Sequence, residues 1–204
     1  MARLDPPPPS RSIDPSFVIV EPDAALMRVF NPHRPWHPGP VSFNYYGPYN
    51  RFDHHRSGSP DAARGVLYAA RTLSCCLVEV FGDVGVVDDP GCCLARITLK
   101  RGLRLVDLCG AGAMRAGTVT AIGAVPDRAL TQAWARYFYE MPVYQRCDGL
   151  RYHGAHNNEE CFVFFERAEE AIASDLEDTI PLNAPRIYPL ILQHALQHKL
   201  LVTF

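Results

Sequence analysis

A single carboxylate, Glu79, lies in the otherwise apolar segment 73–81 (LSCCLVEVF). Removing a charged group from water costs free energy unless a partner or a ligand compensates for the loss. Upstream, Arg51 lies in the loop GPYNRFD and Tyr68 in the short apolar segment GVLYAA. Guanidinium groups bind phosphate oxygens, tyrosine rings stack on cationic heterocycles, and carboxylates stabilise oxocarbenium ions. Together these residue types fit a pyridine dinucleotide, which carries phosphates and a pyridinium ring.

Residue spacing predicts the elements that must position these side chains. In the segment around Glu79, apolar residues recur at intervals of three and four, which is typical of a helix with one apolar stripe. Thr72 or Ser74 is expected to cap the start of this helix, and Gly82 to end it. The preceding segment 65–70 has the length and composition of a strand. Glu79 is therefore expected at the border of the apolar stripe of a helix.

Each of the three residues also has an ordinary explanation. Arg51 can be a solvated charge on a loop, Tyr68 an aromatic residue of the core, and Glu79 the partner of a nearby arginine. Only the combination of the three points to a bound ligand.

The combination resembles the RES-domain family, which supplies the toxin of many bacterial toxin–antitoxin pairs. The resemblance is carried by four residues and their contexts: Arg28 in LMRVF, Arg51 in GPYNRFD, Tyr68 in GVLYAA and Glu79 in CCLVEVF. Two later segments match further strands of the family pattern, LRLVDL at 103–108 and DGLRYHG at 148–154. The matching segments occur in the expected order, and the most specific of them lie between residues 47 and 83.

The resemblance implies a fold of the α+β class, an ADP-ribosyltransferase-like split mixed sheet surrounded by short helices. It also implies that NAD is a substrate whose nicotinamide N-glycosidic bond is cleaved. By matching position, Glu79 is expected to hold the nicotinamide ribose and stabilise the transition state, with Arg28 as a second catalytic residue. Arg28 and Arg51 are expected to bind the pyrophosphate, and Tyr68 to pack against the nicotinamide.

One position departs from the family pattern. The serine that follows the late strand of the family aligns with Gly154, so the signature reads Arg, Glu and Gly in this chain. Gly154 is expected at the NAD-binding site, where the neighbouring His153 could supply a polar group. The change is compatible with weaker turnover, with a different acceptor, or with a binding protein that has little catalytic activity.

Three functions fit these residues. The first is an NAD glycohydrolase or phosphorylase that acts as a toxin, which needs no strong general acid because nicotinamide leaves as a neutral molecule. The second is a protein ADP-ribosyltransferase. The third is an NAD-binding or partner-binding module with weakened catalysis. For any of them the resemblance implies that a helix-turn-helix antitoxin protein is a possible partner.

Length and composition fit one enzyme domain. The chain has 204 residues, of which 48% are hydrophobic, and can bury a substantial core. Residues 1–15, which include PPPPS, are predicted to form a flexible proline-rich tail, and residues 16–204 a single NAD-binding domain. The net charge of −2 provides no large basic surface for nucleic acid or anionic lipid. We therefore expect the arginines to serve a local ligand.

The chain is expected to be cytoplasmic. Its start lacks the apolar core of a signal peptide, and the weakly apolar region 108–126 is interrupted by Arg115 and several glycines. The seven cysteines lack C-x-x-C spacing and are interpreted as buried small hydrophobic residues. No metal site is expected, since His194 and His198 have no obvious third ligand, and His54 and His55 are expected to be exposed on a loop.

The rest of the chain alternates strand and helix patterns without repeats, as α+β proteins do. The glycine-rich LVDLCGAGAMRAG has the wrong spacing for a dinucleotide fingerprint and is interpreted as a loop. The predicted elements are strands at 92–100 and 103–108 joined by a tight turn, a helix at 127–140, strands at 149–153 and 161–166, and helices at 167–173 and 189–200.

Overall fold

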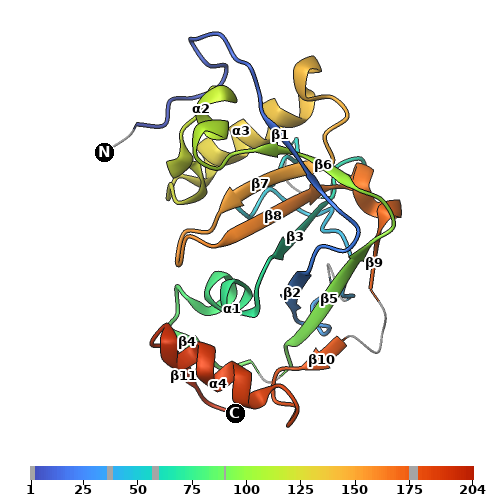
Figure 1. The fold of residues 1–204 in the computed structure, drawn as a ribbon, viewed down its shortest axis with the longest axis vertical. Coiled ribbons are helices and arrows are strands. Elements are labelled where there is room, and N and C mark those ends of the chain that lie inside the picture. Colours follow the sequence, from blue (N-terminus) through green and yellow to red (C-terminus); the bar gives the residue numbers. More distant parts are fainter. Residues whose placement is uncertain (1–2, 36–38, 57–59, 90, 175–178) are drawn as a thin grey trace.

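The computed structural model describes residues 3–35, 39–56, 60–89, 91–174 and 179–204 (Figure 1). In these residues nine strands form one curled mixed sheet, in the order β1-β6-β7-β8-β3-β2-β5-β10, with β9 paired to β5. The strands are β1 (Phe17–Val20), β2 (Leu26–Phe30), β3 (Val66–Ala70), β5 (Cys93–Leu99), β6 (Leu103–Asp107), β7 (Gly149–His153), β8 (Glu160–Phe165), β9 (Ile172–Ala173) and β10 (Thr179–Pro181). The predicted α+β class with a mixed sheet and short helices is confirmed.

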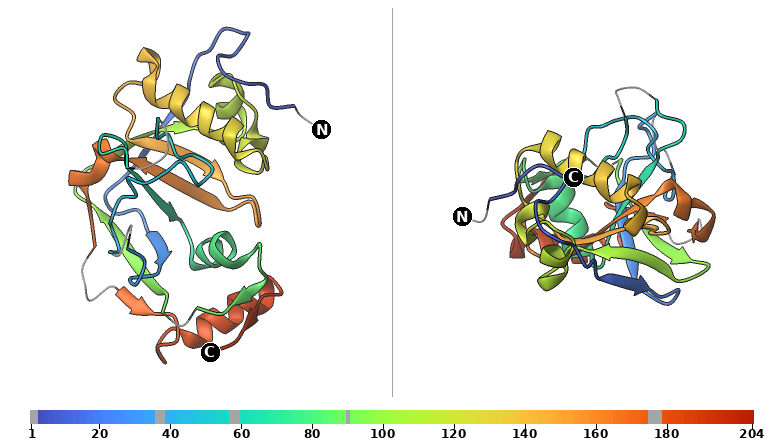
Figure 2. Two further views of the ribbon diagram at one scale, coloured as in Figure 1. Left: turned by 180° about the vertical axis from the view of Figure 1, so that it is seen from behind. Right: turned by 90° about the horizontal axis from the view of Figure 1, so that it is seen from above.

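Short helices surround this sheet. They are α1 (Leu73–Phe81), α2 (Ala111–Arg115), α3 (Arg128–Glu140), α4 (Tyr188–Gln197), and 3-10 turns at Thr120–Gly123, Pro142–Tyr144 and Glu166–Ala171. Helix α1 packs against β2 and β3, and α2 and α3 lie beside β6 and β7 (Figures 1 and 2). Helix α4 lies at the other end of the molecule, with a separate parallel pair formed by β4 (Val86–Val87) and β11 (Leu201–Val202). No helix in the described ranges combines the length and apolar composition that a membrane crossing needs.

The sheet opens between β2 and β3. Strand β3 is paired to β8 along its whole length, and β2 is paired to β5 along its whole length. Between β2 and β3, in contrast, the ladder contains a single pair, Met27 opposite Ala70. The two strands therefore diverge from this point, and backbone and side-chain groups of both can face a common space.

Two strands predicted as neighbours are separated in the sheet. The segments β5 and β6 were expected to be joined by a tight turn at Arg101-Gly102; the chain bends there, but the strands do not pair with each other. The end of β5 pairs with β9, and β6 pairs with β1 from its first residue, Leu103 opposite Val20. Because other strands take both hydrogen-bonding edges, the turn connects distant parts of the curled sheet and closes no hairpin.

The glycine-rich segment after β6 is also different from the prediction. It was expected to be a loop, but it contains the short helix α2. Asp107 accepts a hydrogen bond from the Cys109 N–H at 2.9 Å, and Gly110 adopts a φ of +51° just before the helix. A side chain would disfavour that backbone conformation, so the glycine permits the sharp entry into α2. Farther along, the predicted helix at 167–173 is a 3-10 helix that gives way to β9.

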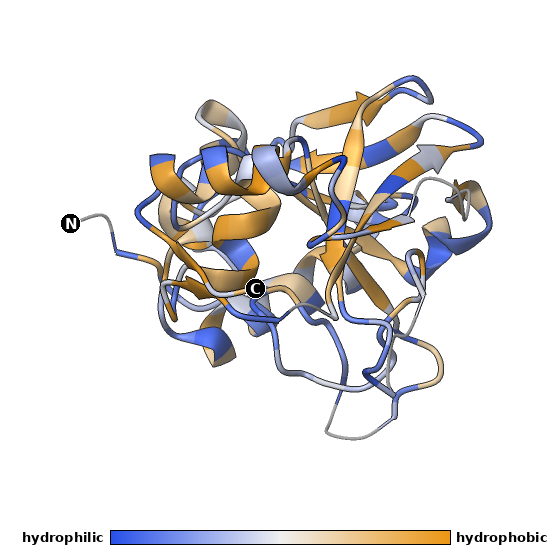
Figure 3. Ribbon diagram, turned by 90° about the horizontal axis from the view of Figure 1, so that it is seen from below, coloured by the Kyte–Doolittle hydropathy of each residue, from blue (hydrophilic) through white to orange (hydrophobic). Residues whose placement is uncertain are grey.

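The core lies on both faces of the central strands. In β3, Val66 and Ala70 belong to the core on the α1 side, whereas Leu67 and Ala69 belong to the core on the opposite side. Strand β8 alternates in the same way, which explains why both strands are apolar along their length rather than alternately polar. Figure 3 shows this distribution, with hydrophobic residues along the strands and hydrophilic residues in the connecting loops.

Helix α1 is formed by local signals and held by its apolar face. Its cap is Thr72, whose hydroxyl accepts a hydrogen bond from the Cys75 N–H at 3.0 Å, and Gly82 follows its last residue. Both ends agree with the prediction. Leu77 in the middle of the helix is 0% exposed and belongs to the core between α1 and the sheet. Burial of this face therefore fixes which side of α1 is turned toward β2 and β3.

Replacing Leu77 with Ala is expected to lower the free energy of unfolding by about 2–5 kcal/mol, because it leaves a cavity in the core. The matched control is Leu196→Ala in α4, whose side chain is 80% exposed; its effect should stay within about 0.5 kcal/mol. Urea denaturation followed by circular dichroism measures both. Equal losses in the two variants would contradict the assignment of Leu77 to the core.

Candidate active site

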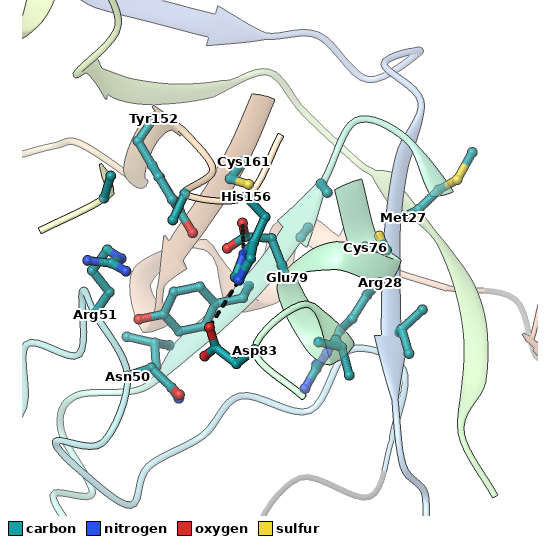
Figure 4. Close-up of a pocket in the computed structure, with 18 of the residues that line it drawn as sticks. Met27, Arg28, Asn50, Arg51, Cys76, Glu79, Asp83, Tyr152, His156 and Cys161 are labelled. Carbon is teal, nitrogen blue, oxygen red and sulfur yellow. Dashed lines mark hydrogen bonds and ion pairs between the residues drawn. The ribbon is translucent and has the colours of Figure 1, made fainter. Parts of the chain in front are cut away.

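A cavity of about 570 Å³ opens where β2 and β3 diverge. This volume lies in the range of about 300–1,000 Å³ that is usual for small-molecule sites. Its walls come from β2, β3, α1, the loop that contains Asn50 and Arg51, the segment that leads into α3, and the end of β7 with the loop that follows (Figure 4). All predicted site residues except Gly154 line this cavity: Arg28, Arg51, Tyr68 and Glu79.

One face of α1 forms the acidic wall. Cys76, Glu79, Val80 and Asp83 all line the cavity. Residues three, four and seven positions apart share one face of a helix, and Gly82 keeps the right-handed helical conformation, so that Asp83 lies one turn beyond Glu79. The Glu79 side chain is 27% exposed and the Asp83 side chain 82%. Glu79 is thus half-buried at the border of the apolar stripe, as predicted.

The partner of Glu79 is a histidine. His156 Nδ1 lies 3.3 Å from Glu79 Oε1, and His156 Nε2 lies 3.1 Å from Asp83 Oδ1. Figure 4 shows the imidazole ring between the two carboxylates. Burial opposes the charge of His156, but the hydrogen bonds to Asp83 and Glu79 outweigh burial and raise its pKa above the ordinary value. Among the described residues no arginine pairs with Glu79, so the alternative of an arginine partner does not hold.

Two glycines permit this approach. A Cβ at Gly82 would lie 2.6 Å from His156 Cδ2, and a Cβ at Gly154 would lie 2.6 Å from Glu79 Oε1. Real side chains do not approach that closely, so either substitution would force the neighbouring group to move. Gly154 therefore lies directly beside the Glu79 carboxylate, and its place in NAD binding stays a prediction. His153 does not line the cavity; the histidine beside Glu79 is His156.

Arg28 is held in place by backbone carbonyls. It is 9% exposed, and its Nη1 donates to Ser42 O at 3.1 Å and to Pro40 O at 3.3 Å. Burial lowers the pKa of Arg28 to about 10, so the guanidinium remains charged at neutral pH. Within the described part of the chain these two bonds involve Nη1 alone. Neither Nε nor Nη2 has an acceptor among the described residues, so both could serve an anionic ligand.

Two further arginines line the opposite side of the cavity. Arg51 donates through Nη1 to the carbonyl of Val125, and Arg128 donates to Tyr49 O at 3.4 Å. In Figure 4, Arg51 and Arg28 lie on either side of the group formed by Glu79, His156 and Asp83. Arg51 is half-buried rather than fully solvated. The cavity therefore presents one acidic wall between cationic groups.

Tyr68 lines the cavity and also organises the loop that carries Arg51. Its hydroxyl donates to Asp53 Oδ1 at 2.9 Å and accepts from the Phe52 N–H at 2.9 Å. Burial, followed by the charge of Asp53, raises the pKa of Tyr68 well above its ordinary value, so the hydroxyl stays protonated. Packing against nicotinamide remains a prediction, but Tyr68 has a structural role in addition.

Asp53 is the centre of this loop. It is 0% exposed, and its Oδ2 accepts from the N–H groups of Tyr49 and Asn50, each at 2.8 Å. With the bond from Tyr68, one buried carboxylate receives three hydrogen bonds. A buried charge is tolerated when it is satisfied in this way. Asp53 thereby fixes the loop segment that places Arg51 on the cavity wall.

Sequence reasoning missed several residues of the site. His156 carried no recognisable signal, because it lies in an irregular loop. Asp83 had one, since its spacing of four from Glu79 predicts a shared helix face. Tyr152 also had one: alternation in β7 places it on the face opposite the half-buried Arg151 and His153. It lines the cavity, and its ring centroid lies 4.7 Å from that of Phe52. Arg128, directly after the helix cap Asp127, carried none.

The prediction that His54 and His55 are exposed is wrong. Both are 0% exposed. His54 Nε2 lies 3.2 Å from Glu166 Oε2, and its ring lies 4.2 Å from that of Tyr139. His55 Nε2 contacts Asn44 O at 3.1 Å. The loop folds inward because the hydrogen bonds of Asp53 hold its middle inside the protein, and the two imidazoles that follow Asp53 are buried with it.

The structure also shows the surroundings of His198 and of the cysteines. His198 Nε2 lies 2.8 Å from Ser74 Oγ and joins the end of α4 to the start of α1. In the described residues no group of three His, Cys, Asp or Glu side chains is arranged as a metal site. All seven cysteines are free and six are buried, as expected of small hydrophobic residues. Cys75 Sγ and Cys161 Sγ lie 3.2 Å apart behind Glu79.

Fold and cavity define an α+β protein with a cleft in which a half-buried carboxylate lies between arginine side chains. A family model for the RES domain matches residues 25–186. The chain therefore belongs to the RES-domain family, and the predicted resemblance is confirmed. No curated protein and no solved structure matches it significantly.

Replacing Asp53 with Ala is expected to lower the free energy of unfolding by about 2–4 kcal/mol, because two backbone N–H groups and the buried Tyr68 hydroxyl lose their acceptor. Asp23→Ala, at an exposed position, should change it by less than about 0.5 kcal/mol. Chemical denaturation measures both variants. A loss in Asp53→Ala no greater than that of the control would show that the loop is held by other contacts.

Proposed function

We propose that this protein cleaves the N-glycosidic bond between nicotinamide and ribose in NAD, as a glycohydrolase or a phosphorylase. The observation that supports this proposal is the half-buried Glu79 carboxylate in a cavity flanked by Arg28 and Arg51. Family membership points the same way, since the resemblance to RES domains led to the same substrate. NAD carries the matching groups, a pyrophosphate for the arginines and a ribose that becomes cationic for the carboxylate.

Glu79 would act on the developing positive charge. When the bond between ribose C1′ and the pyridinium nitrogen breaks, its electron pair goes to the nitrogen and neutralises the ring. The ribose then becomes an oxocarbenium-like cation, which a nearby carboxylate stabilises. The oxygen of water or phosphate forms the new bond to C1′ and releases its proton to solvent. Nicotinamide leaves as a neutral molecule, so no strong acid is needed at the leaving group.

Arg28 and Arg51 would bind the pyrophosphate and so orient the ribose toward Glu79. Both guanidinium groups are already fixed through Nη1 to backbone carbonyls. A side chain that is held before the ligand arrives loses little conformational entropy on binding. Pre-organised charges also stabilise the transition state without reorganising during the reaction. Arg28, at the more buried position, would contribute to catalysis as well as to binding.

As an NAD-consuming enzyme, the protein would arrest growth by depleting NAD, in the manner of a toxin of a toxin–antitoxin pair. A cognate helix-turn-helix antitoxin protein would then keep it inactive until needed. The acceptor distinguishes this function from protein ADP-ribosylation. With NAD labelled in the adenosine half, hydrolysis gives free labelled ADP-ribose and phosphorolysis gives its 1-phosphate. Label that stays bound to protein after denaturation would indicate transfer to a target instead.

Replacing Glu79 with Gln or Ala is expected to lower the kcat for nicotinamide release by about 100-fold or more, the usual loss for removing a main electrostatic group. The affinity for NAD should change much less, because the arginines remain. The exposed Glu170 gives the matched control, and Glu170→Gln should keep full activity. Chromatography of nicotinamide measures turnover, with and without phosphate, and calorimetry measures NAD binding.

Two outcomes would contradict the proposal. If the unsubstituted protein binds NAD but releases no nicotinamide in either buffer, the protein is a binding module rather than an enzyme. If Glu79→Gln retains a kcat within about 10-fold of the unsubstituted protein, or about 1.4 kcal/mol in barrier, Glu79 does not stabilise the transition state.

A further inference from the structure

We propose that His156 and Asp83 are positioning residues that hold the Glu79 carboxylate in its reactive orientation through one imidazolium shared between two carboxylates. The inference rests on the proposed function, since it assigns a role to these residues in the use of Glu79. It concerns residues that the sequence pattern did not single out.

The hydrogen-bond geometry around His156 supports this assignment. Both ring nitrogens of His156 face carboxylate oxygens, at 3.3 Å for Glu79 and 3.1 Å for Asp83. Ionised carboxylates only accept hydrogen bonds, and a neutral imidazole donates from one nitrogen alone. A neutral ring would therefore set one nitrogen lone pair against a carboxylate oxygen. An imidazolium donates from both nitrogens, so the geometry fits the charged ring.

The second carboxylate keeps the cluster negative. A pair of ionised Glu79 and protonated His156 would have no net charge and would attract an oxocarbenium ion only weakly. Asp83 brings the net charge of the three groups back to minus one. Asp83 is 82% exposed, so solvent screens much of its effect, and its share should be modest. His156 thus orients Glu79, and Asp83 compensates for the charge that His156 introduces.

The surrounding backbone is shaped for this contact. Gly82 lies between Glu79 and Asp83 on the chain and leaves room for the edge of the His156 ring, while Gly154 leaves room for the carboxylate itself. At Gly154 a side chain would meet Glu79 Oε1 at 2.6 Å. A serine there could not coexist with the present position of Glu79. Gly154 and His156 therefore both contribute to the position of the Glu79 carboxylate.

The titratable groups around His156 come from α1 and from the other walls of the cavity. The charged groups that face it directly are Glu79 and Asp83, both from α1 and its C-terminal end. The other titratable groups that line the same cavity are Arg28, Arg51, Tyr68, Cys76, Arg128, Tyr152 and Cys161. The buried thiols and phenols keep their protons in the neutral range, because burial raises the pKa of Cys76, Tyr68 and Tyr152. His156 is consequently a group in this cavity whose pKa is raised from its ordinary value by the two carboxylates that face it.

The first test measures the proton on His156. Nuclear magnetic resonance follows the histidine ring signals with pH, and the signal missing in His156→Ala identifies His156 among the eight histidines. We expect its pKa to lie above the ordinary value of 6.5, and to fall in Asp83→Asn and in Glu79→Gln, because each variant removes one of the two charges that raise it. A titration at or below 6.5 in the unsubstituted protein, or no shift in either variant, would overturn the proposal.

The second test measures catalysis. His156→Ala is expected to lower the kcat for nicotinamide release by about 10-fold, with a much smaller change in KM, because Glu79 loses its orientation but the arginines still bind NAD. Asp83→Asn should lower kcat by about 3-fold, since its charge is largely exposed. His156→Gln, which can donate to one carboxylate, should recover part of the loss. The control is His153→Ala, outside the cavity, which should stay within about 2-fold.

The pH profile separates positioning from a merely structural role. In the unsubstituted protein kcat should fall as the pH rises through the pKa of His156, because the ring loses one of its two hydrogen bonds. In His156→Ala and His156→Gln this alkaline decrease should be absent. Thermal denaturation checks that each variant is folded, and Asp83→Asn provides an independent variant at an exposed site.

The possible failures are distinguishable. If the unsubstituted protein releases no nicotinamide, the proposed function fails, while the ring titration still decides whether His156 is shared between the carboxylates. If nicotinamide is released but His156→Ala keeps full kcat and the alkaline decrease, the positioning role fails and the proposed function stands.

Discussion

The divergence of β2 and β3 is the constraint on which the site depends. A sheet ladder that continued past the pair of Met27 and Ala70 would close the space between these strands with backbone hydrogen bonds. Instead each strand satisfies its backbone on the outer side, β2 with β5 and β3 with β8. Helix α1 packs against both strands and presents Glu79 at the opening. The strand pairing therefore creates the cavity, and side chains of the surrounding elements line it with charged groups.

Two carboxylates, the buried Asp53 and the half-buried Glu79, have different roles in the site. Asp53 is fully buried and satisfied by three hydrogen bonds, so it serves structure by fixing the loop that carries Arg51. Glu79 is half-buried and faces the cavity, and within the described ranges its one hydrogen-bond partner is the His156 imidazole. The difference lies in the number of hydrogen bonds that each carboxylate already receives. Glu79 therefore keeps more accepting capacity than Asp53, and unlike Asp53 it lines the cavity.

The proposed reaction requires charge stabilisation more than proton transfer, and the cavity contains charged side chains for it. Its arginines are fixed by backbone carbonyls, and its acidic wall is oriented by His156. Such groups cost no reorganisation when the bond breaks, which is the main advantage of a pre-formed site. Gly154 fits this scheme, because the space beside it is used by the Glu79 carboxylate.

The sequence by itself determined the α+β class, helix α1 with its cap at Thr72 and its end at Gly82, and the four cavity residues Arg28, Arg51, Tyr68 and Glu79. These follow from local spacing, capping and a family pattern, all of which are written along the chain. Only the tertiary structure decided the sheet order, the burial of His54 and His55, and the pairing of His156 with Glu79. Such contacts join segments far apart in the chain, so they depend on which strand edges and core faces meet, and no local pattern records that.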